Sequence, residues 1–414
     1  MYRRLPAEPA RPLAPAFALN LRHAGIGSAV KRKEVGTAIA ENGAAFTVLS
    51  APDSIAWLLN MRGGDIPNTP VALCYAVVAR DGGVELFIDR RKLSPELLDA
   101  FDDDITIRLP EDLGAVLDAL GASGCRVLVD PATAPSWLSN RLGSAGAGII
   151  HGGDPCGTLK ACKNQAELDG ARAAHVRDGA SLCRFLAWLA RTAPDGGVSE
   201  ISASEHLYAC RSGNELFHGV SFETISATGS NGAIVHYRVD KKSNTMLAPG
   251  SVYLVDSGAQ YLDGTTDVTR TVWIADVGSA PGEEVRDRFT RVLKGHIAVA
   301  TARFPTGTSG GQLDTLARGA LWRAGLDYDH GTGHGVGSFL GVHEGPQRIS
   351  KHSSSVALQP GMIVSNEPGY YKEGAYGIRI ENLVVVRPAQ APQNAERAML
   401  EFETITLAPI DRDL

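Results

Sequence analysis

Two kinds of segment are missing from this 414-residue sequence. It contains no run of 18 apolar residues, so a transmembrane helix is not expected. It also contains no long basic block, and its 40 Lys and Arg against 46 Asp and Glu give a formal charge of −6. Neither a membrane nor a nucleic acid is therefore expected as a partner.

The sequence also has no paired cysteine motif and no leader-like segment. Its six cysteines are scattered without a CxxC pair, which is typical of reduced, mostly buried thiols in a cytoplasmic protein. Pro12 and Pro15 interrupt the apolar part of the N-terminus, and no convincing cleavage site follows. We therefore predict a flexible lead-in over residues 1–30 and a cytoplasmic location.

The length of the chain favours two domains, because one hydrophobic core rarely serves 414 residues. Short apolar runs alternate with helical patterns in the first part, which predicts a small α/β domain over residues 31–157. Its expected strands are Phe46–Ser50, Val71–Val78, Val84–Asp89, Ile105–Leu109, Arg126–Asp130 and Gly148–His151, and its expected helices are Lys31–Glu41, Ser94–Phe101, Glu111–Leu120 and Pro135–Leu142. The segment Gly152–Cys162, which contains Gly, Pro and Cys, marks the predicted boundary.

A second domain is predicted over residues 158–414. Asn164 and Glu167 have the spacing of a capping box, which predicts a long helix through about Ala193. Further helices are expected at Ser199–Arg211, Gly282–Arg303 and Gly311–Ala324, with strands and turns between them, which indicates an α+β fold. No internal period of 20–50 residues is present, so a solenoid is not expected.

Five residues of metal-binding type stand in glycine-rich or strand-like contexts of this second domain. They are Asp256, Asp267, His334, Glu367 and Glu381. Four carboxylates in one cavity raise one another's pKa values unless cations balance them, and two divalent ions would do so. Oxygen-rich ligation with one imidazole suits Mn²⁺, Co²⁺, Fe²⁺ or Zn²⁺, and two such ions could generate a bridging hydroxide. If the five converge, the chain is predicted to be a hydrolase.

Strand parity predicts how well the two aspartates can meet. Asp263-Gly264 is a hairpin turn signal between the strand ending at Asp256 and the strand after Asp267. A two-residue turn there pairs Asp256 with Thr271, which puts the aspartates on one face but about 13 Å apart. A turn nearer Tyr261-Leu262, or a bulge, would bring them together, so parity supports the pair and leaves its register open.

The two glutamates give a clearer prediction. Gly374 is the midpoint between Glu367 and Glu381 and lies in the turn-rich segment KEGAYG. A hairpin centred on it places the two glutamates directly opposite each other. Arg379, two residues before Glu381, should face the same side and could neutralise or orient a carboxylate.

Three further histidines are candidates for contacts to a substrate. His330 lies with His334 in the glycine-rich DHGTGHGVG, His343 follows in GVHEGP, and His236 lies in GAIVHYRVD. Neutral or charged imidazoles at such positions could hydrogen-bond an amide or a developing oxyanion. The remaining histidines, including His218, His296 and His352, are interpreted as structural, and HEGPQ is not the HExxH of a mononuclear zinc protease.

These segments resemble the metallopeptidases with the pita-bread fold, and within them the aminopeptidase P (Xaa-Pro aminopeptidase) branch. The matching segments are HYRVD, VDSGAQYLDGTTDVTRT, HGTGHGVGSFLGVHEGP, SNEPGYY and GIRIENLVVV, and PDSIAWLLNMRGGDIPNTPV is similar to the middle domain of the larger cytosolic type. The resemblance implies a creatinase-like α/β domain followed by a pita-bread catalytic domain, without the first domain of the larger members. It leaves open whether the chain forms a homodimer.

The resemblance also implies roles for the candidate residues. Asp256 would hold one metal, Asp267 and Glu381 would bridge both, and His334 and Glu367 would complete the other. The metals would be two divalent ions, with Mn²⁺ expected and Zn²⁺ or Co²⁺ as alternatives. Glu367 would shuttle a proton, His236 and His343 would contact the substrate and the tetrahedral intermediate, and His330 would lie on the proline side.

The implied activity is hydrolysis of the N-terminal Xaa-Pro bond of peptides. One alternative is a prolidase-like enzyme that uses the same ligands but cleaves only Xaa-Pro dipeptides. Another is a binding protein that keeps the pita-bread fold but has lost catalysis. The complete ligand set argues against the second alternative, and a comparison of tripeptide with dipeptide substrates would separate the first.

Overall fold

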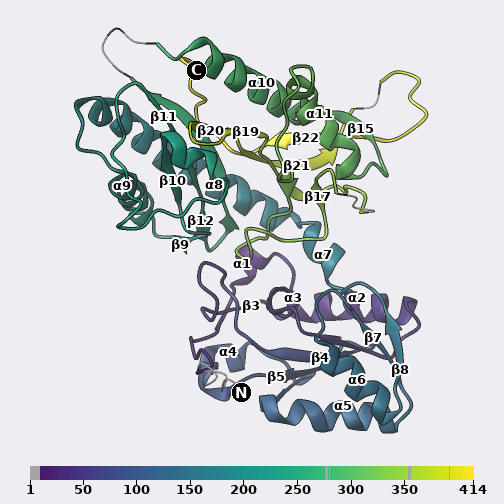
Figure 1. The fold of residues 1–414 in the computed structure, drawn as a ribbon. Coiled ribbons are helices and arrows are strands. Elements are labelled where there is room, and N and C mark those ends of the chain that lie inside the picture. The colour runs from purple at the N-terminus through teal and green to yellow at the C-terminus, as the bar shows by residue number, and fades with distance from the viewer. Residues whose placement is uncertain (1–9, 276–277, 279, 353–355, 391) are drawn as a thin grey trace, which may run out of the picture. The chain divides into compact units, whose positions relative to one another are not determined.

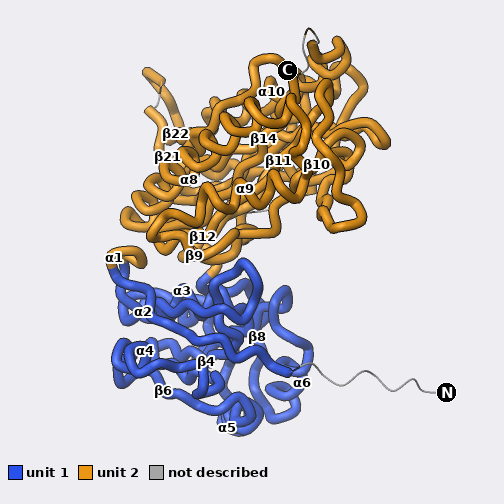
Figure 2. The backbone as a smooth tube through the Cα atoms, turned by 90° about the vertical axis from the view of Figure 1, so that its left-hand side faces the viewer, with its two compact units in different colours: residues 1–21, 26–156 blue, residues 22–25, 157–414 orange. Residues whose placement is uncertain are grey.

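The computed structural model describes residues 10–275, 278, 280–352, 356–390 and 392–414. The chain forms two compact units, one of residues 1–21 and 26–156 and one of residues 22–25 and 157–414 (Figure 2). The division at residues 156 and 157 lies within the segment 152–162. No helix of the described residues is long and apolar enough to cross a membrane.

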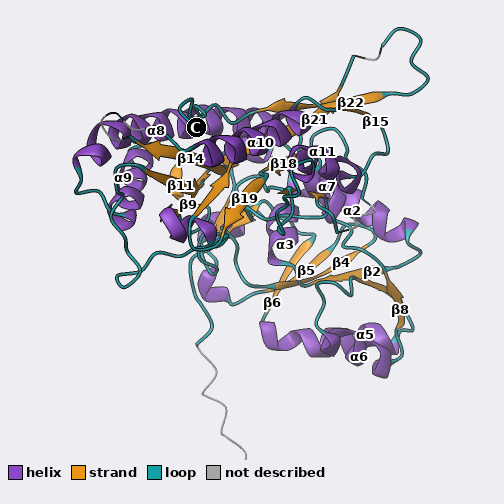
Figure 3. Cartoon of the chain, turned by 45° about the horizontal axis from the view of Figure 1, so that its top comes forward, coloured by secondary structure: helices purple, strands orange, loops and turns teal. Residues whose placement is uncertain are grey.

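The first unit is built around a mixed six-stranded sheet of order β6-β5-β4-β2-β7-β8. Its strands are β1 (Phe17–Ala18), β2 (Phe46–Leu49), β3 (Met61–Arg62), β4 (Tyr75–Ala79), β5 (Val84–Phe87), β6 (Ile105–Arg108), β7 (Arg126–Val129) and β8 (Gly148–His151), and its α-helices are α2 (Ser28–Glu41), α3 (Pro52–Leu58), α4 (Pro95–Asp99), α5 (Leu113–Ala122) and α6 (Ser136–Ala145). Helices α2 and α3 lie on one face of the sheet and α5 and α6 on the other (Figures 1 and 3). Apolar residues of α5 and α6, such as Leu117 and Leu142, pack on Val48 and Val127 of the strands.

Two details of this unit differ from the predictions. Residues 10–30 are not a free lead-in, because Phe17–Ala18 pairs with Met61–Arg62 and α2 begins at Ser28. Strand β4 begins at Tyr75 rather than at Val71. In the residues just before it, Leu73 donates its N–H to Asp65 and accepts from Lys92 Nζ, so side chains rather than a neighbouring strand satisfy this backbone.

The second unit packs helices against several short antiparallel sheets. Its helices are α1 (Leu21–Ala24), α7 (Gly157–Ala161), α8 (Gln165–Thr192), α9 (Glu200–Ser212), α10 (Glu283–Ala300) and α11 (Gly310–Trp322). Its strands are β9 (Phe217–Val220), β10 (Ile225–Thr228), β11 (Ser251–Ser257), β12 (Ala259–Tyr261), β13 (Gly264–Thr265), β14 (Val268–Ile274), β15 (Arg303–Pro305), β16 (Gly333–His334), β17 (Arg348–Ile349), β18 (Ile363–Asn366), β19 (Gly369–Lys372), β20 (Tyr376–Arg379), β21 (Asn382–Pro388) and β22 (Met399–Thr404). The predicted capping box is present, since Asn164 accepts from Glu167 N and Glu167 accepts from Asn164 N.

Two of these sheets position the site. The first has the order β10-β11-β14, and the second has the order β15-β22-β21-β18. Apolar side chains of α8 and α9, such as Phe185 and Leu207, pack with Tyr253 and Val268 of the first sheet. Residues of α11 and of the second sheet, such as Ala317 and Val384, share another core. The strands therefore have helices behind them, and their polar residues are free to face a cavity.

Candidate active site

The two aspartates reach one face of the sheet by a register that differs from the turn signal. Asp256 pairs with Thr269, so Asp267 is its diagonal neighbour on the same face. Tyr261 pairs with Gly264, which places the turn at Leu262-Asp263. The turn thus lies one residue nearer Tyr261-Leu262 than the signal at Asp263-Gly264, which is the direction that brings the aspartates together.

Close packing against a helix explains the glycine of this turn signal. A Cβ on Gly264 would lie 3.1 Å from Ala171 Cα of α8, so the glycine allows the hairpin to approach that helix. Gly264 does not have a positive φ, unlike the glycine of a type I′ turn. The sequence thus suggests that Gly264 forms the turn, whereas in the fold it allows the hairpin to pack against α8.

The register of the two glutamates agrees with the prediction. Gly369 pairs with Arg379 in the β19–β20 hairpin, and Asn366 pairs with Asn382 in β18–β21. The same register on both sides places Glu367 opposite Glu381. The turn lies at Gly374, whose φ of 72° favours glycine.

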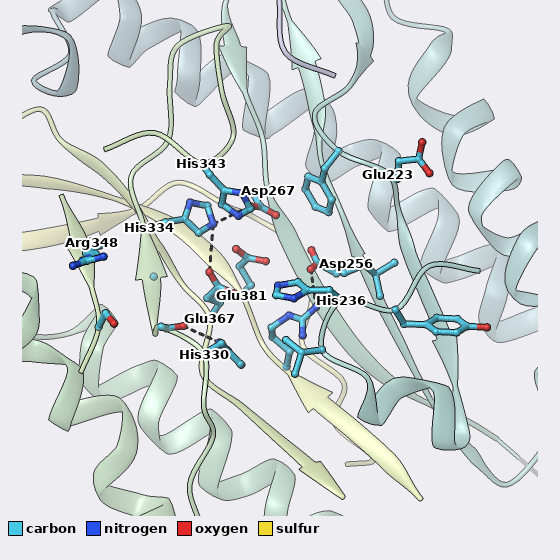
Figure 4. Close-up of a pocket in the computed structure, with 18 of the residues that line it drawn as sticks. Glu223, His236, Asp256, Asp267, His330, His334, His343, Arg348, Glu367 and Glu381 are labelled. Carbon is cyan, nitrogen blue, oxygen red and sulfur yellow. Dashed lines mark hydrogen bonds and ion pairs between the residues drawn. The ribbon is translucent and has the colours of Figure 1, made fainter. Parts of the chain in front are cut away.

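His334 lies at the centre of the candidate metal site (Figure 4). Its Nδ1 faces the carbonyl oxygen of Gly335 at 3.0 Å and therefore carries the proton. The lone pair of Nε2 then faces Asp267 Oδ2 at 3.5 Å and Glu367 Oε1 at 3.3 Å. A lone pair directed at two carboxylate oxygens is stabilised by a cation between them.

The carboxylates around this imidazole have oxygens without hydrogen-bond partners. Buried oxygens of Asp256, Asp267 and Glu381 accept no hydrogen bond. Asp267, His334 and Glu381 each offer a ligand atom, and these atoms lie within 4.8 Å of one another. Unpaired buried acceptors are costly in a folded protein, so this donor set fits divalent cations.

Neutral hydroxyl groups hold one oxygen of each glutamate. Thr269 Oγ1 donates to Glu381 Oε2 at 2.8 Å, and Ser365 Oγ donates to Glu367 Oε1 at 2.9 Å. These bonds orient both carboxylates. Glu381 Oε1 has no hydrogen-bond partner, and Glu367 Oε1 also faces His334 Nε2. Sequence reasoning missed both hydroxyls, because serine and threonine are too common to form a recognisable pattern.

The negative charge of the four carboxylates is only partly balanced by nearby positive charge. Burial, together with Asp256 and Glu367, raises the pKa of Asp267 well above its ordinary value. Burial and Asp267 raise the pKa of Glu381 in the same direction, and burial raises that of Glu367. The guanidinium of Arg379, which bonds Asp256, supplies one positive charge against four carboxylates.

The three other candidate histidines line the same cavity, which has a volume of about 520 Å³. The ring of His343 lies 4.1 Å from that of His334, and burial lowers the His343 pKa to about 4. His330 Nε2 lies 2.8 Å from the hydroxyl of Tyr371, and burial lowers the His330 pKa to about 3. His236 is an exposed residue of the cavity wall.

Two of the histidines interpreted as structural have different surroundings. His296 is buried and contacts the Asn366 carbonyl, away from the cavity. His352 lines the cavity, which sequence reasoning did not anticipate. Arg348 also lines it, and its Cα pairs with that of His334 across β16 and β17.

Comparison with known proteins identifies the family of this chain. Residues 169–388 match metallopeptidase family M24, and residues 7–167 match the creatinase/prolidase N-terminal domain. A probable Xaa-Pro aminopeptidase P of Coprinopsis cinerea is 46% identical over 98% of this chain and 67% of its own length. A probable Xaa-Pro aminopeptidase P of Sordaria macrospora is 42% identical over 99% of this chain and 68% of its own.

Among solved structures, the X-prolyl aminopeptidase of Caenorhabditis elegans superposes with a TM-score of 0.91 at 35% identity. The match covers 98% of this chain and 66% of that one, which is described as a cytosolic enzyme with a di-nuclear active site. The chain thus spans between 57% and 68% of the length of these and similar curated relatives. The chain belongs to metallopeptidase family M24 and, as its sequence motifs predicted, is similar to the Xaa-Pro aminopeptidases P of that family.

Proposed function

We propose that this protein is a dinuclear metal-dependent aminopeptidase that hydrolyses the bond between an N-terminal residue and proline. The observation that carries the proposal is the lone pair of His334 Nε2, which faces two carboxylate oxygens beside buried, unpartnered oxygens of Asp267 and Glu381. The similarity to Xaa-Pro aminopeptidases P supports the substrate class.

The five candidate ligands would share two divalent cations. Asp256 would hold one, His334 and Glu367 the other, and Asp267 and Glu381 both. A set of four carboxylates with one imidazole favours Mn²⁺, with Zn²⁺ or Co²⁺ as alternatives. When bound, the two ions would supply an acidified water as nucleophile and polarise the scissile carbonyl.

Glu367 is the proposed proton shuttle. Its Oε1 lies 3.3 Å from His334 Nε2, so the carboxylate is within the candidate metal site, where the nucleophile would form. It would accept the proton of the nucleophile and deliver it to the proline nitrogen, which needs that proton to leave. Ser365 would hold Glu367 in position through its 2.9 Å hydrogen bond.

The histidines would bind the substrate. His236 and His343 would contact its backbone and the tetrahedral intermediate, and His330 would lie beside the proline. The low pKa values of His330 and His343 keep both rings neutral near pH 7. The His343 ring could then donate one hydrogen bond to the substrate without adding positive charge, whereas the ring nitrogens of His330 already face Gly331 O and the Tyr371 hydroxyl. We also propose a cytoplasmic location, which the cytosolic relative from Caenorhabditis elegans and the free cysteines of the described residues support.

The test combines metal analysis with a choice of substrates. Purified protein should contain or take up two metal ions per chain and release the first residue from an Xaa-Pro-Yaa tripeptide. Cleavage of Xaa-Pro dipeptides alone would indicate a prolidase-like enzyme instead. Metal binding without release of any amino acid would indicate a binding protein, and either result overturns the proposal.

A further inference from the structure

The loop that carries His236 has little regular secondary structure. It runs from the end of β10 at Thr228 to the start of β11 at Ser251, with one short 3-10 helix at Gly229–Ala233. His236 is exposed, and so is Ile234 at 56%. Tyr237, which is 6% exposed, supplies the apolar anchor next to His236 by packing with residues of β10 and β11.

Glu200 joins three parts of this loop. It is the first residue of α9, and it is fully buried. Its carboxylate accepts from Thr228 N at 2.8 Å and Asn231 Nδ2 at 2.9 Å at the start of the loop. It also accepts from Tyr237 Oη at 3.0 Å in the middle and from Thr245 N at 3.0 Å near the end.

All of these donors are neutral, and two of them are backbone N–H groups. A buried carboxylate satisfied by several fixed donors is held in one orientation, and it fixes the donors in turn. The backbone of Glu200 adds one link to the loop and one to β10, because its N–H donates to Thr245 O and its carbonyl accepts from Ser226 Oγ. One side chain thus ties the start, middle and end of the loop to the first turn of α9.

We propose that Glu200 is a positioning residue that sets His236 over the metal site, acting through Tyr237 and the ends of the loop. The inference rests on the proposed function, in which His236 contacts the substrate. Glu200 does not line the cavity, so it would touch neither substrate nor metal. We therefore expect Glu200 to affect the reaction only indirectly, by fixing the position of His236.

A double-mutant cycle tests this dependence. Glu200→Gln keeps the shape of the side chain but replaces one carboxylate oxygen with an NH₂ group, which donates hydrogen bonds instead of accepting them. Whichever way the amide turns, this NH₂ faces the backbone N–H of Thr228 or Thr245, which can only donate, so one hydrogen bond is lost. We expect kcat/KM for an Xaa-Pro tripeptide to fall about tenfold. Misplacing a reacting group by about 1 Å can cost roughly 100-fold, and the displacement expected for His236 is smaller than that. The loss should lie mainly in kcat, because His236 is proposed to contact the tetrahedral intermediate.

The second half of the cycle repeats the substitution in a His236→Ala background. If Glu200 acts through His236, Glu200→Gln should then change kcat/KM by less than about twofold, since coupled residues do not add. A loss of the same tenfold size in both backgrounds would overturn the inference. Inactivity of the unmodified enzyme on the tripeptide would instead overturn the proposed function, so the two failures are distinguishable.

Further variants guard against a simple loss of folding. Tyr237→Phe removes one donor to Glu200 while keeping the buried ring, and the same cycle with His236→Ala should give the same lack of additivity. Glu205→Gln, on the exposed side of α9, is the matched control and should leave kcat/KM unchanged. Metal content and melting temperature are measured for every variant, and a fall in activity that follows metal loss rather than His236 would overturn the inference.

Discussion

Arg379 donates from Nη2 to Asp256 Oδ2 at 2.7 Å and joins β20 to β11 in the interior of the second unit. Its Nη1 donates to the hydroxyl of Tyr371 at 2.6 Å, and this hydroxyl also contacts His330 Nε2. The guanidinium is therefore fixed from two sides. It compensates part of the negative charge of the carboxylate cluster and, through Tyr371, links Asp256 to His330.

The first prediction concerns Arg379→Met in metal-free protein. Removing one partner of a buried ion pair leaves the other charge uncompensated, which costs about 3–5 kcal/mol of unfolding free energy. Tyr371→Phe is the matched control, because it removes the hydroxyl that contacts the same guanidinium and His330 but leaves the ion pair intact, and it should cost about 2 kcal/mol. Urea unfolding measures both values, and equal losses in the two variants would contradict the prediction.

The second prediction concerns Asp267→Ala. If Asp267 bridges two cations, bound metal should fall below two per chain and activity should be lost. The fall in kcat/KM should exceed about 100-fold, since even residues that only orient metal ligands cost 10–100-fold. Glu373→Gln, in the exposed turn between β19 and β20, should change neither quantity. Full activity of Asp267→Ala would refute the assignment.

The glutamate pair shows what sequence could predict about the site. Gly374 lies midway between two apolar strands, and its positive φ makes it the natural centre of the turn. The pairing of Glu367 with Glu381 then follows, because each lies seven residues from Gly374. The position of Arg379 on the same side follows from the alternation of side chains along a strand. The family motifs predicted the same fold, and the matched domains confirm it.

The aspartate pair shows where sequence reasoning stops. Nothing near Gly264 in the sequence reveals that α8 packs against it, so its glycine was interpreted as a turn former. The hydroxyls of Thr269 and Ser365, which orient two carboxylates, were missed because such partners follow only from the three-dimensional register. The position of His352 in the cavity wall was not predicted for the same reason.

The third prediction concerns the charge of His343. Burial, then the neighbouring His334, lowers its pKa to about 4, so the ring is neutral across the range from pH 6 to 8. His343→Gln, a neutral hydrogen-bonding substitute, should keep more activity than His343→Ala. Its pH profile of kcat/KM between pH 6 and 8 should match that of the unmodified enzyme. A displaced midpoint in that range would show that His343 titrates there.

The fourth prediction concerns removal of the metals and pH. The pKa values of Asp267 and Glu381 are raised by burial and by the other carboxylates, so the metal-free folded protein binds protons that the unfolded chain releases. Stability falls with pH wherever the folded state binds more protons. For these two residues that window begins near pH 4, the ordinary carboxyl pKa, and extends upward.

The melting temperature of protein treated with a chelator should therefore decrease as the pH rises above about 5. Metal-loaded protein should not show this decrease, because two cations replace the protons, and its melting temperature should be higher by a margin that grows with pH. Metal binding at neutral pH should also release protons, which calorimetry in buffers of different ionisation enthalpy detects. If chelated protein instead becomes more stable between pH 5 and 8, the carboxylates do not form the repelling cluster that the geometry implies.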